Sequence, residues 1–161
     1  EKFTANGRDT VEFFLSANPG ESPKPLAKIA SGGELSRIML AIVSVLSEGD
    51  PADTVIFDEV DSGVSGKTAQ KIGVLLKAAA ARPQVLCVTH LAQIAAMADR
   101  HLLITKQSDA DRTTTTVRAL DEQGRREELA RILGGMQITD AALQAADALI
   151  AEGRKQTERF R

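Results

Sequence analysis

The order of apolar and polar residues divides the chain into alternating strands and helices. From 32 to 48 the apolar positions recur with the helical period of about 3.6 residues, which predicts a helix buried on more than one side. Residues 54–57 form a short continuous apolar run, and 85–88 form a second, as is typical of strands inside a parallel sheet. The segment between them, 67–81, again has helical periodicity. This order predicts a right-handed, parallel α/β unit.

The flanking segments predict further elements of both kinds. Strands are expected at 10–17, 102–106 and 113–120, and helices at 91–98, 127–133 and 139–151. Together these elements predict one α/β lobe, with a mostly parallel sheet and helices on both faces. We divide it into a strand and loop at 1–30, a chemistry-bearing part at 31–151, and a frayed tail at 152–161.

The composition narrows the classes of protein. A net charge of −2 argues against a basic face that binds nucleic acid over the whole lobe, although a local patch stays possible. Aromatic residues make up 3% of the chain, with no Trp or Tyr, which removes the usual stacking platforms for single-stranded nucleic acid. The single cysteine, Cys87, excludes an internal disulfide and indicates a reducing cytosol. No apolar run approaches the roughly 18 residues that span a bilayer, so we expect no membrane association.

The first candidate site is the start of the predicted helix at 32–48. Ser31, Gly32 and Gly33 form a small-residue turn that would aim free backbone N–H groups at an anion such as a phosphate. Taken alone, the turn favours a structural interpretation, because Ser31 and Glu34 fit a capping box that stabilises helices without binding anything. Two glycines in the first helical turn cost roughly 0.5–1 kcal/mol each relative to Ala. Their presence suggests that something must approach the backbone.

Adjacent carboxylates follow the predicted strand at 54–57. Asp58 and Glu59 come directly after it, at the end where ligands bind in open α/β sheets. One acid there can help to hold Mg²⁺ while the next orients and deprotonates a water molecule. An exposed acidic turn without function is as good an interpretation of this pair alone.

Two further short segments carry residues with possible chemistry. His90 follows the predicted strand at 85–88, and parallel strand ends share one crevice, so we expect it beside the two acids, whereas His101 is expected to be structural. Residues 65–68, SGKT, imitate the end of a P-loop. That pattern requires glycine at position 61, where Asp61 stands, so a P-loop is not expected there. No His/Cys set has the spacing of a zinc site.

Taken in order, the motifs resemble those of the ATP-binding-cassette (ABC) ATPases. They read SGGELSR, TVIFDEVDSGVSG and VTH, and the variant forms THLAQIA and ELARILGG are similar to the DNA-repair branch related to the SMC and Rad50 proteins. The similarity extends from about residue 25 to 150. Because VTH and THLAQIA overlap, these are four ordered motifs, and their order makes the similarity specific, whereas any one alone would not be.

The resemblance implies a role for each matching position. Nucleotide contacts fall to Ser31, Gly32, Gly33 and Glu34 of the signature and to Asp61, Ser62 and Gly63 of the loop that crosses the dimer interface. The signature would contact the γ-phosphate of ATP held by a second, facing head. Asp58 would hold Mg²⁺, Glu59 would be the general base and His90 the switch histidine near the γ-phosphate. Arg37 matches the family pattern, but its spacing reveals no role.

The resemblance also implies what must complete the site. The chain contains no Walker A motif and no coiled-coil heptads. We therefore expect the C-terminal lobe of a P-loop NTPase-like head, which needs an N-terminal Walker A lobe and would hydrolyse no ATP alone. The implied cofactors are ATP and Mg²⁺. The implied partners are that lobe, a second head in an ATP-dependent homodimer, and DNA, in the cytoplasm at the nucleoid.

The sequence is compatible with three alternatives. The fragment could belong to a DNA-tethering, cohesion-like clamp in which hydrolysis is secondary to head engagement. A transporter-type ATPase subunit is less favoured, because the signature lacks the SGGQ form. The basic tail residues could contact DNA, although a solvated charged tail is the simpler interpretation; they are Arg154, Lys155, Arg159 and Arg161.

Overall fold

The computed structural model describes residues 3, 5, 7–16, 20–28, 31–46, 52–109, 112–135 and 137–159. The strands are β1 (Phe14–Leu15), β2 (Lys24–Pro25), β3 (Thr54–Phe57), β4 (Gln84–Cys87), β5 (Leu102–Ser108) and β6 (Thr113–Ala119). The helices are α1 (Gly32–Leu46), α2 (Gly66–Ala79), α3 (Ala92–Ala95), α4 (Glu122–Gly134) and α5 (Asp140–Arg159), with a short 3₁₀ turn at Leu26–Lys28. The predicted α/β class is confirmed.

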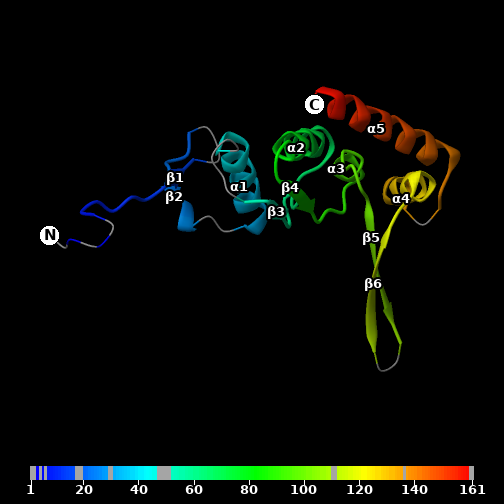
Figure 1. Ribbon diagram of the computed structural model, residues 1–161, viewed down its shortest axis with the longest axis horizontal. Helices are drawn as coiled ribbons and strands as arrows, with labels where there is room; N and C mark the ends of the chain where they lie inside the picture. The colour runs from blue at the N-terminus through cyan, green and yellow to red at the C-terminus, as the bar shows by residue number, and fades with distance from the viewer. Residues whose placement is uncertain are drawn as a thin grey trace.

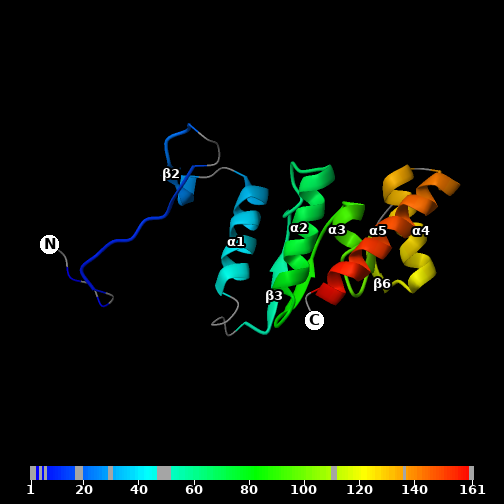
Figure 2. The ribbon, with the colours of Figure 1, turned by 90° about the horizontal axis from the view of Figure 1, so that it is seen from above.

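The central unit is β3–α2–β4, as the apolar pattern predicts. β3 and β4 pair in parallel, with Thr54 opposite Gln84 and Phe57 opposite Cys87. Both strands therefore end at the same edge, which brings the segments after Phe57 and after Cys87 side by side. In Figure 2, α1, α2 and α3 follow one another along the long axis of the molecule.

The strand arrangement differs from the mostly parallel sheet that the sequence predicts. Among the described residues, β3–β4 is one of three two-stranded sheets, and the other two, β1–β2 and β5–β6, are antiparallel. The β5–β6 pairing follows from a connection of only four residues, which is long enough for a hairpin and far too short for a parallel crossover. The hairpin projects away from the helices (Figure 1).

Helices cover one face of β3–β4 rather than both. Val55 and Phe57 face the core, where they pack with Leu40 of α1 and Ile72 of α2. The opposite face is open, and Ile56 is 67% exposed. Leu86 in the neighbouring strand β4 and Val88, directly after that strand, are also exposed. The sequence marks both faces as apolar, and the chain itself buries only one of them.

The accessible surface agrees with this open face. It measures 11813 Å², whereas a compact monomer of this mass is expected to expose about 7,800 Å². The extended N-terminal arm, visible in Figure 1, contributes to the difference together with the hairpin and the uncovered strands.

A second core joins α3, α4 and α5. It is built largely from alanines and Leu129, which is fully buried. α5 continues to Arg159, so the predicted frayed tail is wrong for 152–159. The close crossing over α3 explains the longer helix, because a Cβ at Gly153 would lie 2.2 Å from the carbonyl oxygen of Ala96.

Several predicted boundaries also shift. The strand expected at 10–17 is reduced to Phe14–Leu15, and the helix expected at 91–98 to Ala92–Ala95. α4 begins at Glu122 rather than 127 because Asp121 caps it, its side chain accepting a hydrogen bond from the backbone N–H of Gly124 at 2.8 Å. No helix in the described part of the chain is long and apolar enough to cross a membrane.

Candidate functional site

The start of α1 has the capping geometry that the sequence leaves as one alternative. The hydroxyl of Ser31 accepts a hydrogen bond from the backbone N–H of Glu34 at 3.2 Å, and the carbonyl of Ser31 accepts one from Leu35. Ser31, Gly32 and Glu34 are exposed, so the same turn is also open to a ligand. Capping and anion binding are therefore compatible here.

The two glycines allow the chain's own turn to approach the helix. A Cβ at Gly33 would lie 2.7 Å from the Cβ of Ser62 and 2.9 Å from the carbonyl oxygen of Glu59. A Cβ at Gly32 would lie 2.5 Å from a carboxylate oxygen of Glu59. The close approach that the glycines predict is thus real, and in this structure it is made by residues 59–62.

Two side chains of α1 hold that turn in place. Ser36 donates its hydroxyl hydrogen to the carbonyl oxygen of Asp58 at 2.6 Å. Arg37 donates from Nη1 to the carbonyl oxygens of Ser62 at 2.8 Å and Val60 at 3.3 Å. Sequence reasoning gave Arg37 no role and missed Ser36. The signal was their spacing, since positions three and four residues after Gly33 share its helix face.

The turn places Glu59 in an uncommon backbone conformation. Its φ is +57°, in the left-handed region that non-glycine residues seldom adopt. Local hydrogen bonds hold it there: Asp58 Oδ1 accepts from the N–H of Glu59 at 2.9 Å, and the carbonyl of Glu59 accepts from the N–H of Ser62 at 2.9 Å. Such strain is found where a fixed side-chain direction matters. Both Asp58 and Glu59 are exposed.

His90 lies against the same turn, through Asp61. The Asp61 carboxylate oxygen Oδ2 is 3.1 Å from His90 Nδ1 and accepts hydrogen bonds from the backbone N–H of His90 at 2.9 Å and the hydroxyl of Thr89 at 2.6 Å. The structure therefore brings His90 and the acidic turn together, as expected from parallel strand ends. Asp61 itself is only 3% exposed, which leaves Ser62 and Gly63 as the open part of the expected interface loop.

The negative charge at this edge also acts on Cys87, at the end of β4. Burial, followed by the carboxylates of Asp61 and Asp58, raises the pKa of the Cys87 thiol to about 12. Both carboxylates therefore lie close enough to affect the thiol at the end of the neighbouring strand.

The donor set suits a metal ion that keeps most of its own ligands. Among the described residues no group of three or more His, Cys, Asp or Glu side chains is placed to hold a metal. Mg²⁺ usually takes one or two carboxylates and completes its shell with water and substrate phosphates. The exposed carboxylate of Asp58 fits that partial role.

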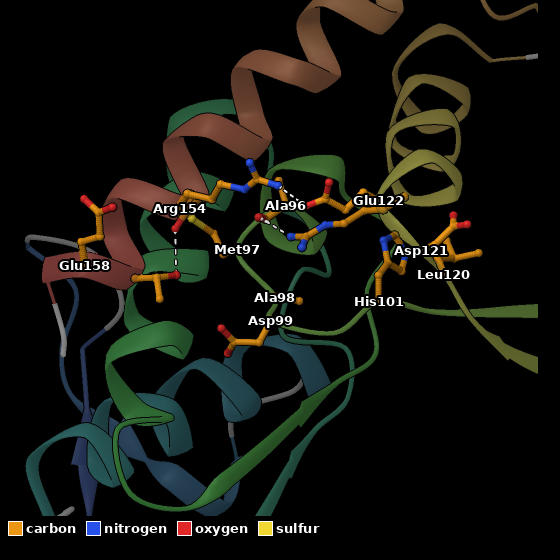
Figure 3. Close-up of a pocket in the computed structure, with 13 residues that line it drawn as sticks. Ala96, Met97, Ala98, Asp99, His101, Leu120, Asp121, Glu122, Arg154 and Glu158 are labelled. Atoms are coloured by element: carbon orange, nitrogen blue, oxygen red, sulfur yellow. Dashed lines mark hydrogen bonds and ion pairs between the residues drawn. The ribbon is translucent and has the colours of Figure 1, made fainter.

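A separate cavity of about 400 Å³ lies between the end of α3, the start of α4 and the last turns of α5. His101, Arg125 and Arg154 line it together with Asp99 and Glu122 (Figure 3). Arg125 donates to the carbonyl oxygens of Ala95 and Ala96, which ties α4 to the end of α3. None of the predicted site residues lines this cavity, and we treat it as part of the packing between the helices.

The parallel pair β3–β4, with the predicted site residues gathered at the edge where both strands end, places the chain in the α/β class. The chain is 51% identical over 148 residues to the DNA repair protein RecN of Halalkalibacterium halodurans, 46% over 151 residues to that of Bacillus subtilis and 49% over 150 residues to that of Haemophilus influenzae. These matches cover 92–94% of the chain. The chain belongs to the RecN family.

The chain spans about a quarter of the length of these relatives, 26% for the first two and 27% for the third. The match agrees with the C-terminal head lobe that the motifs predict. No protein-family model matches the chain. A solved structure from work on ATP-driven dimerization and DNA-stimulated activation of SMC ATPases aligns with 76% of this chain and 80% of that chain, at 21% identity and a TM-score of 0.48.

Proposed function

We propose that the chain is the C-terminal lobe of an SMC-like ATPase head that acts in the repair of DNA double-strand breaks. The observation that carries the proposal is the assembly of one edge from three segments: the start of α1, the turn at 58–62 and His90. Sequence identity to DNA repair proteins over nearly the whole chain supports the setting.

In this proposal the residues of the edge divide the work on ATP. Ser31 and the backbone amides at the start of α1 bind the γ-phosphate of a nucleotide held by a facing head. Glu59 orients a water molecule and accepts its proton, and its left-handed backbone sets the direction of the carboxylate. Asp58 would hold Mg²⁺, which, when bound, neutralises charge on the phosphates. His90 contacts the transferred phosphoryl group.

The Walker A motif must come from another segment. We propose that an N-terminal lobe supplies it and packs on the open face of β3–β4, where Ile56, Leu86 and Val88 are exposed. Alone, the chain should bind ATP weakly and hydrolyse none. With that lobe, two heads should dimerise around ATP, and the full protein should engage DNA in the cytoplasm.

The test is the ATPase rate of the complete head with Glu59→Gln. The variant should retain ATP-dependent dimers, measured by light scattering, while hydrolysis falls by about 10²–10⁴-fold, the usual contribution of a positioned base. Glu158→Gln, which changes an exposed acid at the far end of α5, is the matched control and should keep the wild-type rate. Unchanged ATP turnover in Glu59→Gln would show that Glu59 is not the general base.

The tethering alternative uses the same edge and differs in whether turnover is needed. Ser31→Arg should abolish ATP-dependent dimers in both cases, because the new side chain fills the start of α1. If Glu59→Gln still bridges DNA as well as the wild type does, then head engagement rather than hydrolysis is the working step.

A further inference from the structure

Asp61 is the charged residue that the described part of the chain buries, at 3% exposure. A buried carboxylate is costly unless it is hydrogen-bonded. Its Oδ2 atom meets the hydroxyl of Thr89 at 2.6 Å, the backbone N–H of His90 at 2.9 Å and Nδ1 of His90 at 3.1 Å. All of these contacts go to Thr89 and His90, two and three residues after the end of β4.

The contact with the ring has a chemical consequence. Oδ2 of Asp61 accepts from two other donors, and a carboxylate oxygen in that role favours a hydrogen on the imidazole nitrogen that faces it at 3.1 Å. In a neutral ring the other nitrogen is then an acceptor, and the tautomer is set by the carboxylate. The His90 side chain is 74% exposed, so Nε2 is the nitrogen left for a ligand.

The surroundings make Asp61 a rigid support. Val60, its neighbour, is fully buried, and Arg37 holds the carbonyls on either side of Asp61, those of Val60 and Ser62. The backbone N–H of His90 donates to the same carboxylate oxygen that lies 3.1 Å from the ring nitrogen Nδ1, so Asp61 holds the backbone of His90 and faces its ring. Orientation of the histidine is thus coupled to the turn that carries Glu59.

We propose that Asp61 is a positioning residue that holds His90 as the Nδ1–H tautomer with Nε2 directed at the nucleotide. The assignment of a catalytic purpose rests on the proposed ATPase function, whereas the tautomer does not. Asp61 therefore acts through His90, without touching the substrate.

The first test is the tautomer of His90 in the chain without nucleotide. Long-range ¹H–¹⁵N correlation spectra at about pH 8.5, where imidazole is neutral, should show Nδ1 protonated and Nε2 bare. Asp61→Ala should shift His90 away from that tautomer. Thr89→Val removes a different donor to the same oxygen and should leave the tautomer unchanged. The signals of His101, the other histidine, serve as the internal control.

The second test is activity in the complete head. Asp61→Ala should lower kcat by at least about 10-fold with little change in KM, which is less than the roughly 10²–10⁴-fold of a group that transfers the proton itself, because Asp61 acts only through His90. Asp61→Asn keeps an oxygen acceptor and should recover most of that loss. An Nε2–H tautomer in the wild type overturns the proposal even if Asp61→Ala does not fold. The expected tautomer with no effect on kcat would contradict the catalytic purpose alone.

Discussion

Arg37 Nη1 donates a hydrogen bond to the carbonyl oxygen of Ser62 over 2.8 Å, and so joins the first turns of α1 to the loop that carries the acids. The same nitrogen lies 3.3 Å from the carbonyl oxygen of Val60. Gly33, one turn earlier on the helix, lets the two segments touch. Residues 31–37 and the acidic turn are therefore joined by hydrogen bonds and close packing. A substitution on this part of α1 should alter the position of Glu59.

This unit predicts the effect of Arg37→Ala on stability. Hydrogen bonds that involve a charged group contribute about 1.5–3 kcal/mol, and the variant should lose that amount from the free energy of unfolding. Urea unfolding measures it. Arg154→Ala, which breaks an exposed ion pair with Glu122, is the control and should cost less than about 1 kcal/mol. Equal effects of the two variants would show that Arg37 does not support the turn.

A second prediction concerns the reactivity of Cys87. With its thiol pKa raised from 9.0 to about 12 by burial and by the carboxylates of Asp61 and Asp58, the thiolate fraction at a given pH near 8 should be roughly a thousandfold below that of a free cysteine, because three pKa units separate them. Alkylation by iodoacetamide, followed by mass spectrometry, measures the rate. In urea the rate should rise to that of an unfolded peptide. Fast labelling of the folded chain would contradict the buried, negative surroundings.

These contacts separate the features that the sequence predicts from those that only the structure reveals. The strand–helix–strand unit was predictable because its apolar runs are short, continuous and separated by a periodic helix. The meeting of His90 with the acidic turn was predictable too, because parallel strands end at one edge. The inward direction of the Asp61 carboxylate was not, since nothing in the pattern DEVD distinguishes an acid that reaches out from one that anchors Thr89.

Other features depended on tertiary contacts that no local pattern contains. The continuation of α5 past Gly153 needs the backbone of Ala96 as its neighbour, and glycine at that position otherwise reads as a helix end. Asp121 is a typical helix cap and could have indicated the start of α4 at Glu122. The boundary was missed because the first turn of the helix is polar and shows no apolar periodicity. The open face of the sheet could not be predicted either. An apolar strand predicts that both of its faces are buried, but it does not show whether this chain or another segment covers them.

A third prediction follows from His101. Burial, and then the positive charge of Arg125, lower the pKa of His101 from its usual 6.5, against a smaller opposing effect of Glu128. The unfolded chain therefore takes up a proton before the folded one does, so stability is full above about pH 6.5 and declines as the pH falls below it. The melting temperature should decrease as the pH is lowered from about 8 to about 5.5. The decrease should be smaller in His101→Gln, because glutamine cannot titrate. Parallel curves for both proteins would contradict the shift.

The last prediction tests what covers the open face of β3–β4. Ile56→Lys and Leu86→Lys place a charge on exposed positions, at 67% and 40% exposure, so each should change the stability of the chain itself by no more than about 0.5 kcal/mol. If the N-terminal lobe packs there, each must bury a lysine against it and should weaken the association of the two lobes by at least about 10-fold, or 1.4 kcal/mol. Isothermal titration of the chain with the separately produced lobe measures the affinity. Val45→Lys is the matched control, because Val45 is 80% exposed on α1, away from the sheet. Wild-type affinity in both sheet variants, with the control unchanged, would place the missing lobe on another surface.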